Sequence, residues 1–190
     1  EGRPSFLARC REAGLRHIGY GVESASPTIL KTIDKSGQSL PKLELAIVET
    51  QRVLGYADTS WMAGSPGETE ATMRESVEFC KRVGLRPEIW FFVTAYPATA
   101  FWKLALERGL IRKAVTGEIG PADDDIIEQY FLRLGEQGEQ VRTNFSEVLS
   151  DDEVEALARW AVAELHPYGN RIREPHSGDT KAIVGATHAD

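Results

Sequence analysis

Short apolar runs alternate with amphipathic stretches along the first 110 residues of the chain. Three of these runs, residues 18–22, 59–63 and 88–94, contain β-branched or aromatic side chains and have the length of buried strands. The stretches between them carry apolar residues at a spacing of three or four, which predicts helices that bury one face. These helices are expected to begin near residues 6, 27, 43, 69 and 101, and several end at a glycine.

This order of elements predicts an α/β fold. Strands that alternate with helices pair in parallel within one sheet. A closed barrel of the standard type needs eight strands and about 250 residues, so three strands form either a small open sheet or about half of a (β/α) barrel. Since the carboxyl ends of parallel strands share one edge, the small and polar residues that follow the three runs are expected to face a common site.

The pattern changes after residue 112. Residues 113–125 are rich in turn formers and end in three aspartates, so a loop is expected there, followed by a short helix over 126–134. Ser150 and Glu153 match a capping box that opens a helix reaching about His166. The chain is therefore divided into half of a barrel (1–112), a helical C-terminal extension (113–170) and a flexible tail (171–190).

The amino-acid composition restricts the classes of partner that the chain is expected to bind. With 42% hydrophobic and 27% charged residues the chain is that of a globular protein, which leaves enzymes and binding modules open. The formal net charge of −7, without a Lys/Arg stripe, argues against a nucleic-acid partner. No apolar run approaches the roughly 20 residues of a membrane span, so no membrane partner is expected.

Cys10 and Cys80 form no disulfide framework, which favours the cytoplasm. Because the chain begins at Glu1, we expect a piece of a longer protein, natural or trimmed.

The stretch from His17 to Ser26, H-I-G-Y-G-V-E-S-A-S, contains the first candidate site. Its two glycines leave one side of the predicted strand bare, so that a ligand can approach the backbone closely. Glu23 is the one carboxylate placed at the end of a predicted buried strand, and Ser24 and Ser26 follow it. These side chains either contact a ligand or simply end the strand and cap the next helix.

Two further turns follow predicted strands. The glycines of Gly64-Ser-Pro-Gly-Glu-Thr69 permit a bend that directs N–H groups toward a ligand, although a tight turn with Glu68 near a helix N-terminus needs none. This turn does not match the phosphate-binding loop G-x-x-x-x-G-K-[ST], which argues against a nucleoside triphosphate. Tyr96 is placed to stack on a flat ligand, and Thr99 is expected to cap the following helix.

Metal ligation is not indicated. The four histidines show none of the spacings of zinc sites. Cys10 and Cys80 fall on apolar helix faces and are interpreted as core residues, as is the run Trp90-Phe91-Phe92, whose alternate members face opposite sides. The sequence therefore assigns no metal ligand and leaves the catalytic residues unknown.

Three motifs together resemble those of the radical S-adenosylmethionine (radical SAM) enzymes. They are G-V-E-S-A-S at 21–26, G-S-P-G-E-T at 64–69 and A-Y-P-A-T at 95–99. In that superfamily the fourth to sixth strands of a partial (β/α)₆ barrel end in G-[VI]-E-S-G-S, G-L-P-G-E-T and P-Y-P-G-T at matching spacing. Ala25, Ser65 and Ala98 depart from this pattern, and the loss of glycine at 25 and 98 makes close backbone approach harder.

The resemblance implies cofactors and site residues. S-adenosylmethionine would lie near Glu23, Ser24 and Ser26, with Gly64, Pro66, Gly67 and Tyr96 flanking adenine and substrate. The superfamily holds a 4Fe-4S cluster on C-x-x-x-C-x-x-C, which is absent from this chain, so its cluster ligands would lie elsewhere in the intact parent. Residues 144–165 are also similar to the region after the barrel in the subgroup with an N-terminal cobalamin-binding domain, which makes cobalamin a further candidate cofactor.

The function expected from this resemblance is that of the C-terminal half of a radical SAM enzyme. The intact parent would cleave S-adenosylmethionine reductively and act on an organic substrate, by methyl transfer or ring modification, whereas this chain alone would be inactive. A non-catalytic α/β module for a small ligand or a protein is the alternative, and a barrel enzyme with Glu23 as general base is a third. Open strand edges predict contact with the missing half of the barrel or self-association.

Overall fold

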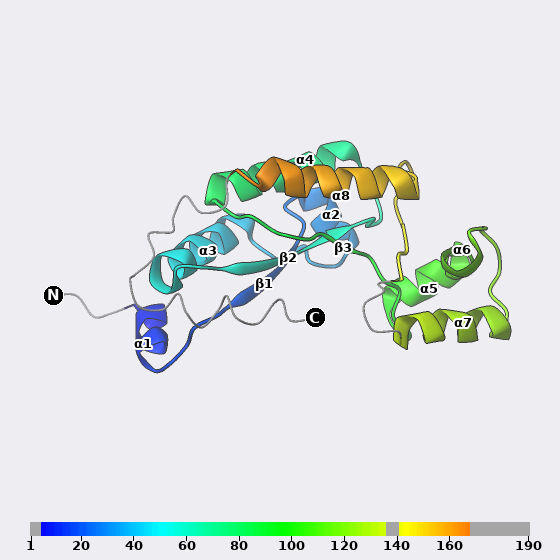
Figure 1. Cartoon of the computed structure of the whole chain (residues 1–190), viewed down its shortest axis with the longest axis horizontal. Helices are drawn as coiled ribbons and strands as arrows, with labels where there is room; N and C mark the ends of the chain where they lie inside the picture. Colours follow the sequence, from blue (N-terminus) through cyan, green and yellow to red (C-terminus); the bar gives the residue numbers. More distant parts are fainter. Residues whose placement is uncertain (1–4, 136–140, 168–190) are drawn as a thin grey trace, which may run out of the picture.

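The computed structural model describes residues 5–135 and 141–167 of the chain. Its sheet contains β1 (Gly19–Glu23), β2 (Asp58–Ala63) and β3 (Phe91–Phe92), in the order β1-β2-β3. Both strand pairs are parallel. This confirms the predicted α/β class and the parallel pairing. Within the described ranges the sheet stays open and forms no barrel (Figure 1).

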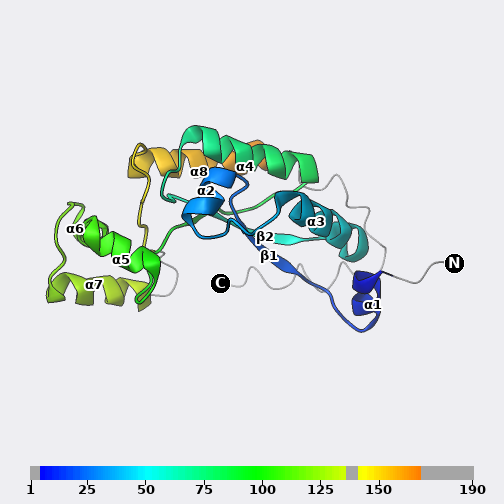
Figure 2. The same ribbon diagram turned by 180° about the vertical axis from the view of Figure 1, so that it is seen from behind.

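One face of the sheet is covered by α3 (Leu40–Leu54), α4 (Glu70–Val83) and α8 (Asp151–Leu165), which Figures 1 and 2 show from both sides. Their apolar faces enclose the main core with β1 and β2. Its fully buried side chains include Val22, Ile47, Trp61, Phe79, Val154 and Leu165. The short helices α1 (Phe6–Glu12) and α2 (Pro27–Thr32) flank β1 in the sequence. The bare backbones of Gly19 and Gly21 are exposed.

A second core lies beyond β3, among α5 (Ala100–Glu107), α6 (Leu110–Thr116) and α7 (Asp124–Gly135), at the right of Figure 1. Tyr130 is fully buried there, and its hydroxyl donates to the carbonyl of Ala95 at 3.0 Å. Phe145, from the chain segment between α7 and α8, packs against Phe101. The turn after β3 is therefore held against α7 by the Tyr130 hydrogen bond.

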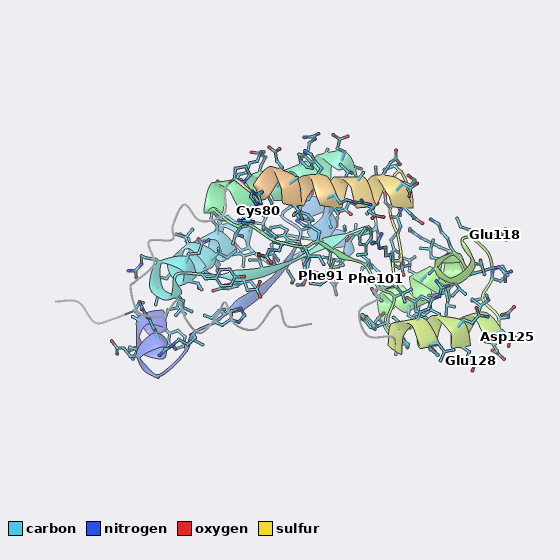
Figure 3. All side chains as sticks on the ribbon, in the orientation of Figure 1. Cys80, Phe91, Phe101, Glu118, Asp125 and Glu128 are labelled. Atoms are coloured by element: carbon cyan, nitrogen blue, oxygen red, sulfur yellow. The ribbon has the colours of Figure 1, made fainter. Side chains whose placement is uncertain are left out.

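Most predicted helix boundaries are confirmed because they rest on local capping. The side chains of Ser5, Thr69, Thr99 and Ser150 each accept a hydrogen bond from a backbone N–H in the first turn of the following helix. Both Thr69 and Ser150 form complete capping boxes. Cys80 lies on the buried face of α4, as expected of a core cysteine (Figure 3). The same expectation is wrong for Cys10, which is only partly buried because α1 buries none of its residues.

Two expectations about secondary structure are wrong. The third strand, expected over 88–94, is limited to Phe91–Phe92, because the preceding segment diverges from β2 and Pro87 has no N–H for a ladder bond. A loop was expected over 113–125, but residues 113–116 form the last part of α6. Gly109 and Gly117, both in the left-handed region, bound this helix, and Leu110 and Ile111 are buried under it.

The proposed division into 1–112, 113–170 and 171–190 stays a prediction, and its tail lies outside the described residues. Among the helices described, none is long and apolar enough to cross a membrane.

Candidate functional site

The carboxyl ends of the strands lie along one edge of the sheet. β1 ends at Glu23 beside Trp61 of β2, and Ala63 at the end of β2 lies beside Phe92 of β3. The turns that follow are also joined directly, because the Thr32 hydroxyl at the end of α2 donates to the carbonyl of Pro66 at 2.9 Å. The first two predicted motifs are therefore neighbours in space.

Glu23 has an unusual backbone and a charged partner. Its φ is +64°, in the left-handed region, and the pairing of β1 with β2 is irregular between Gly21 and Glu23. The Lys35 ammonium lies 3.1 Å from Glu23 Oε1 and also donates to the carbonyl of Gly21 at 2.9 Å. A Cβ on Gly21 would lie 2.8 Å from the Glu23 carboxylate. A side chain at position 21 would therefore displace this ion pair from its place over the strand.

Lys35 was missed by the sequence interpretation, in which Lys35-Ser36-Gly37 only ended a helix. The sequence contained only a weak signal, since both Lys31 and Lys35 follow the carboxylate within one short helix and its end. The side chains of Lys35 and Glu23 are 36% and 19% exposed, so the pair is accessible but partly desolvated. An ammonium and a carboxylate side by side complement a ligand that itself carries a carboxylate and hydroxyl or ammonium groups.

The serines after β1 point into the protein. Ser24 Oγ lies 3.3 Å from Ser76 Oγ of α4, which also accepts the N–H of Ala25 at 2.9 Å. Ser26 is fully buried, and its hydroxyl has no partner among the described residues and does not cap α2. Both hydroxyls thus lie under the strand end, where Ser24 links β1 to α4.

The turn after β2 is built around the carboxylate of Glu68. This side chain is 2% exposed and accepts the N–H groups of Gly64 and Ser65, the latter at 3.3 Å. Burial raises the pKa of the Glu68 carboxyl to about 7, and the two backbone hydrogen bonds oppose that rise only in part. Gly64 and Gly67 both have positive φ, which the bend requires. Glu68 is a buried carboxylate, which the sequence interpretation placed only near a helix N-terminus.

This turn is covered by the segment between α7 and α8. The Phe145 N–H donates to the carbonyl of Gly64 at 2.8 Å, and a Cβ on Gly64 would meet Asn144 at 3.5 Å. The Gly67 N–H donates to Glu147 at 2.9 Å, and Glu147 pairs with Arg108 at 2.7 Å. The N–H of Gly67 is therefore directed to a protein carboxylate in this structure.

The third motif presents an aromatic side chain to solvent. Tyr96 is 59% exposed, so its ring is available to a flat ligand. Thr99 caps α5 as predicted, accepting the Trp102 N–H at 3.1 Å. Ala98, where the superfamily pattern has glycine, has a φ of +65°. Its backbone thus retains the conformation that glycine prefers.

The cysteines do not form a metal site. Cys80 is buried, and burial raises the pKa of its thiol well above the usual value; Cys10 lies on α1. In the part of the chain that the structure describes, no three His, Cys, Asp or Glu side chains gather as a metal site. A 4Fe-4S cluster, which needs several thiolates, does not fit these residues.

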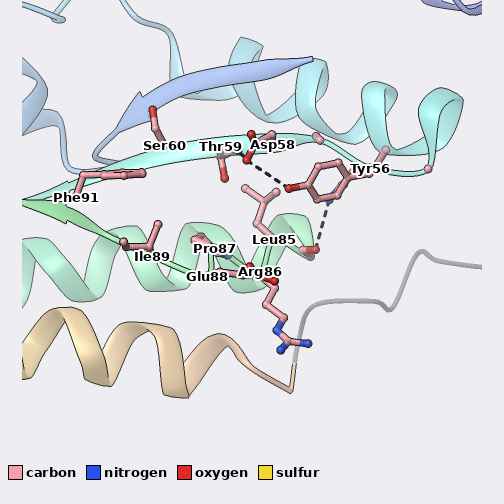
Figure 4. A pocket seen from close by; sticks show the side chains of 14 residues that line it. Tyr56, Asp58, Thr59, Ser60, Leu85, Arg86, Pro87, Glu88, Ile89 and Phe91 are labelled. Carbon is pink, nitrogen blue, oxygen red and sulfur yellow. Dashed lines mark hydrogen bonds between the residues drawn. The ribbon is translucent and has the colours of Figure 1, made fainter. Parts of the chain in front are cut away.

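A pocket lies away from these motifs. It has a volume of about 480 Å³ and opens where β2 begins, between Asp58–Ser60 and the diverging segment Arg86–Ile89 (Figure 4). Tyr56 donates to Asp58 at its rim, at 3.3 Å. The pocket is thus at the amino ends of the strands, whereas ligands of parallel α/β sheets bind at the carboxyl ends.

Comparison with known proteins gives distant, partial similarity. No protein-family model matches the chain. It is similar to an uncharacterized methyltransferase, PH0819, of Pyrococcus horikoshii, with 30% identity over 102 residues, or 53% of this chain and 22% of that protein. It is also similar to the heme chaperone HemW of Mycobacterium tuberculosis, with 28% identity over 129 residues, or 65% of this chain and 30% of HemW. The matched part is less than a third of either relative.

Proposed function

We propose that this chain forms the part of a radical SAM barrel that binds the nucleoside and amino-acid portions of S-adenosylmethionine. The observation that carries the proposal is the Glu23–Lys35 pair above the exposed Gly21 backbone, at the carboxyl end of a parallel strand. The three motifs that resemble this superfamily, and the similarity to a protein named as a methyltransferase, support it.

The chemistry of this pair suits the proposed ligand. The Lys35 ammonium would bind the carboxylate of the methionyl group, and Glu23 would accept hydrogen bonds from the ribose hydroxyls. The bare backbone at Gly21 would allow the ligand to lie directly on the strand. S-adenosylmethionine, when bound in an intact enzyme of this superfamily, supplies the radical chemistry. The residues of this chain would bind and orient it, and the Glu23–Lys35 ion pair would open to do so.

The cluster that such an enzyme requires would be held outside this chain. Reconstitution with iron and sulfide under reducing conditions is expected to give no stable cluster absorbance and no cleavage of S-adenosylmethionine. Methyl transfer or ring modification, with or without cobalamin, and a cytoplasmic location are part of the same proposal for the intact parent. A non-catalytic α/β module that binds a small ligand or a protein is the alternative.

Ligand titrations of variants test the proposal. S-adenosylhomocysteine has the same nucleoside and amino-acid groups, and its binding can be followed by NMR without a cluster. Glu23→Gln and Lys35→Met are each expected to weaken binding about tenfold, the loss of one charge-assisted hydrogen bond of ~1.5 kcal/mol. Glu75→Gln on the exposed face of α4 is the matched control and should bind as the unmodified chain does. Equal binding by all four proteins would refute the proposed site.

A further inference from the structure

The outer edge of β3, and of the irregular segment 88–90 that leads into it, pairs with no other strand among the described residues. β3 is the last strand of the sheet, and its inner edge pairs with Met62 and Ala63 of β2. The segment that follows α7 joins the outer edge only further along, where the Thr143 N–H donates to the carbonyl of Val93 at 2.9 Å. Among the described residues no strand pairs with the outer edge before that point. Such an edge is a template for pairing with another chain.

A groove of about 920 Å³ runs along this edge, between residues 88–92 and α8. Ala158, Val162 and Ala163 form its apolar wall. Trp90 lines it and is 3% exposed, yet its indole N–H has no acceptor among the described residues. The indole nitrogen is itself buried, so a chain added in the groove would not reach this N–H.

The edge is self-complementary about Trp90. In an antiparallel pair of two such segments centred on Trp90, Ile89 of each copy lies opposite Phe91 of the other. These side chains are 53% and 38% exposed, and Figure 3 shows Phe91 on the side of the sheet away from α4 and α8. Apolar pairs directly opposite each other stabilise antiparallel strands.

The charges are also complementary in this register. Glu88 of one copy lies opposite Phe92 of the other, and the Arg142 guanidinium lies 4.5 Å from the centre of the Phe92 ring. Arg142 and Arg159 share the single carboxylate of Glu155, which leaves one positive charge in excess. Glu88 has no ion-pair partner within the described ranges and would balance that charge across the interface.

We propose that two copies of this chain associate through antiparallel pairing of residues 88–92 about a two-fold axis at Trp90. The same patch serves both copies, as in other two-fold interfaces. The sheet of each copy would then continue into the sheet of the other across this edge.

Light scattering tests the association. The mass of the full chain is expected to rise from 21.0 kDa toward twice this value as concentration increases. Phe91→Lys should hold the chain at the monomer mass, because a charge at the edge opposes pairing, and Ile89→Lys should do the same if the first variant folds poorly. Leu45→Lys, a control at a residue 72% exposed on α3, should still dimerise. A monomer at every concentration, or a dimer that tolerates both edge lysines, would overturn the proposal.

Mixed disulfide trapping tests the register. Two variant proteins are prepared in a Cys10→Ser background, one with Ile89→Cys and the other with Phe91→Cys. One of them is isotope-labelled, and the two are mixed under mild oxidation. Opposite Cβ atoms of an antiparallel pair lie close enough for a disulfide, so the mixed dimer should form faster than either self-dimer. Leu45→Cys and Val48→Cys are the control pair on α3. Faster self-dimers, or no crosslink above the control, would contradict pairing about Trp90.

Discussion

Neutralising the buried carboxyl of Glu68 is expected to change how stability depends on pH. Its pKa is about 7 in the folded chain, against 4.5 for the reference carboxyl, a difference of about 2.5. The folded state therefore holds a proton that the unfolded state loses, and stability falls as pH rises from about 4.5 and levels off above about 7. Each pKa unit corresponds to 1.36 kcal/mol, so the full loss is about 3 kcal/mol. Because Glu68 is 2% exposed, solvent screening reduces this value little.

Urea unfolding of the full chain at pH 5, 6, 7 and 8 measures this effect. Glu68→Gln retains a carbonyl oxygen for the Gly64 N–H and removes the titration. The unfolding free energy of the unmodified chain minus that of this variant should fall by about 2–3 kcal/mol between pH 5 and 8. All other groups titrate alike in both proteins and cancel. Glu75→Gln, at an exposed carboxylate on the helix that follows Glu68, is the control and should follow the unmodified chain. A difference that stays constant with pH would refute the reasoning.

Three further predictions concern stability, each measured as the free energy of unfolding in urea. Ala98→Gly should stabilise the chain by about 0.5–1 kcal/mol, because φ is +65° there; a loss of stability would contradict the strain. Ser150→Ala should cost about 1 kcal/mol by removing the α8 capping box, and an unchanged value would mean that the cap contributes nothing. Leu165→Ala should cost about 2–5 kcal/mol, since its side chain is fully buried in the main core; a cost below 1 kcal/mol would show that α8 packs loosely.

The parts of the fold that local chemistry determines could be predicted from the sequence. Thr69, Thr99 and Ser150 begin helices because their side chains cap N–H groups three residues ahead. The parallel sheet follows from the alternation of strands and helices. By contrast, β3 is short because residues 88–90 diverge from β2, which is distant in the sequence, and no local pattern encodes that divergence.

The candidate site was also predictable only where local sequence patterns determine it. Glu23 and the two turns were indicated by their positions after apolar runs. The partners of these residues depend on the tertiary structure: Lys35 reaches back to the carbonyl of Gly21, 14 positions earlier in the chain. Ser146, which donates to the carbonyl of Glu68 at 2.8 Å, lies 78 positions away in the sequence. The sequence contains these residues, but their approach is decided by packing.

The location of the bound ligand on the unmodified chain distinguishes a site at the carboxyl end of β1 from one at the opposite end of the sheet. In an NMR titration of the ¹⁵N-labelled chain with S-adenosylhomocysteine, the account predicts saturable shifts of the amides of residues 21–26 and of Lys35. These residues surround the carboxyl end of β1. Shifts confined to residues 56–60 and 85–89, which line the pocket at the opposite end of the sheet, or no shifts at all, would contradict it.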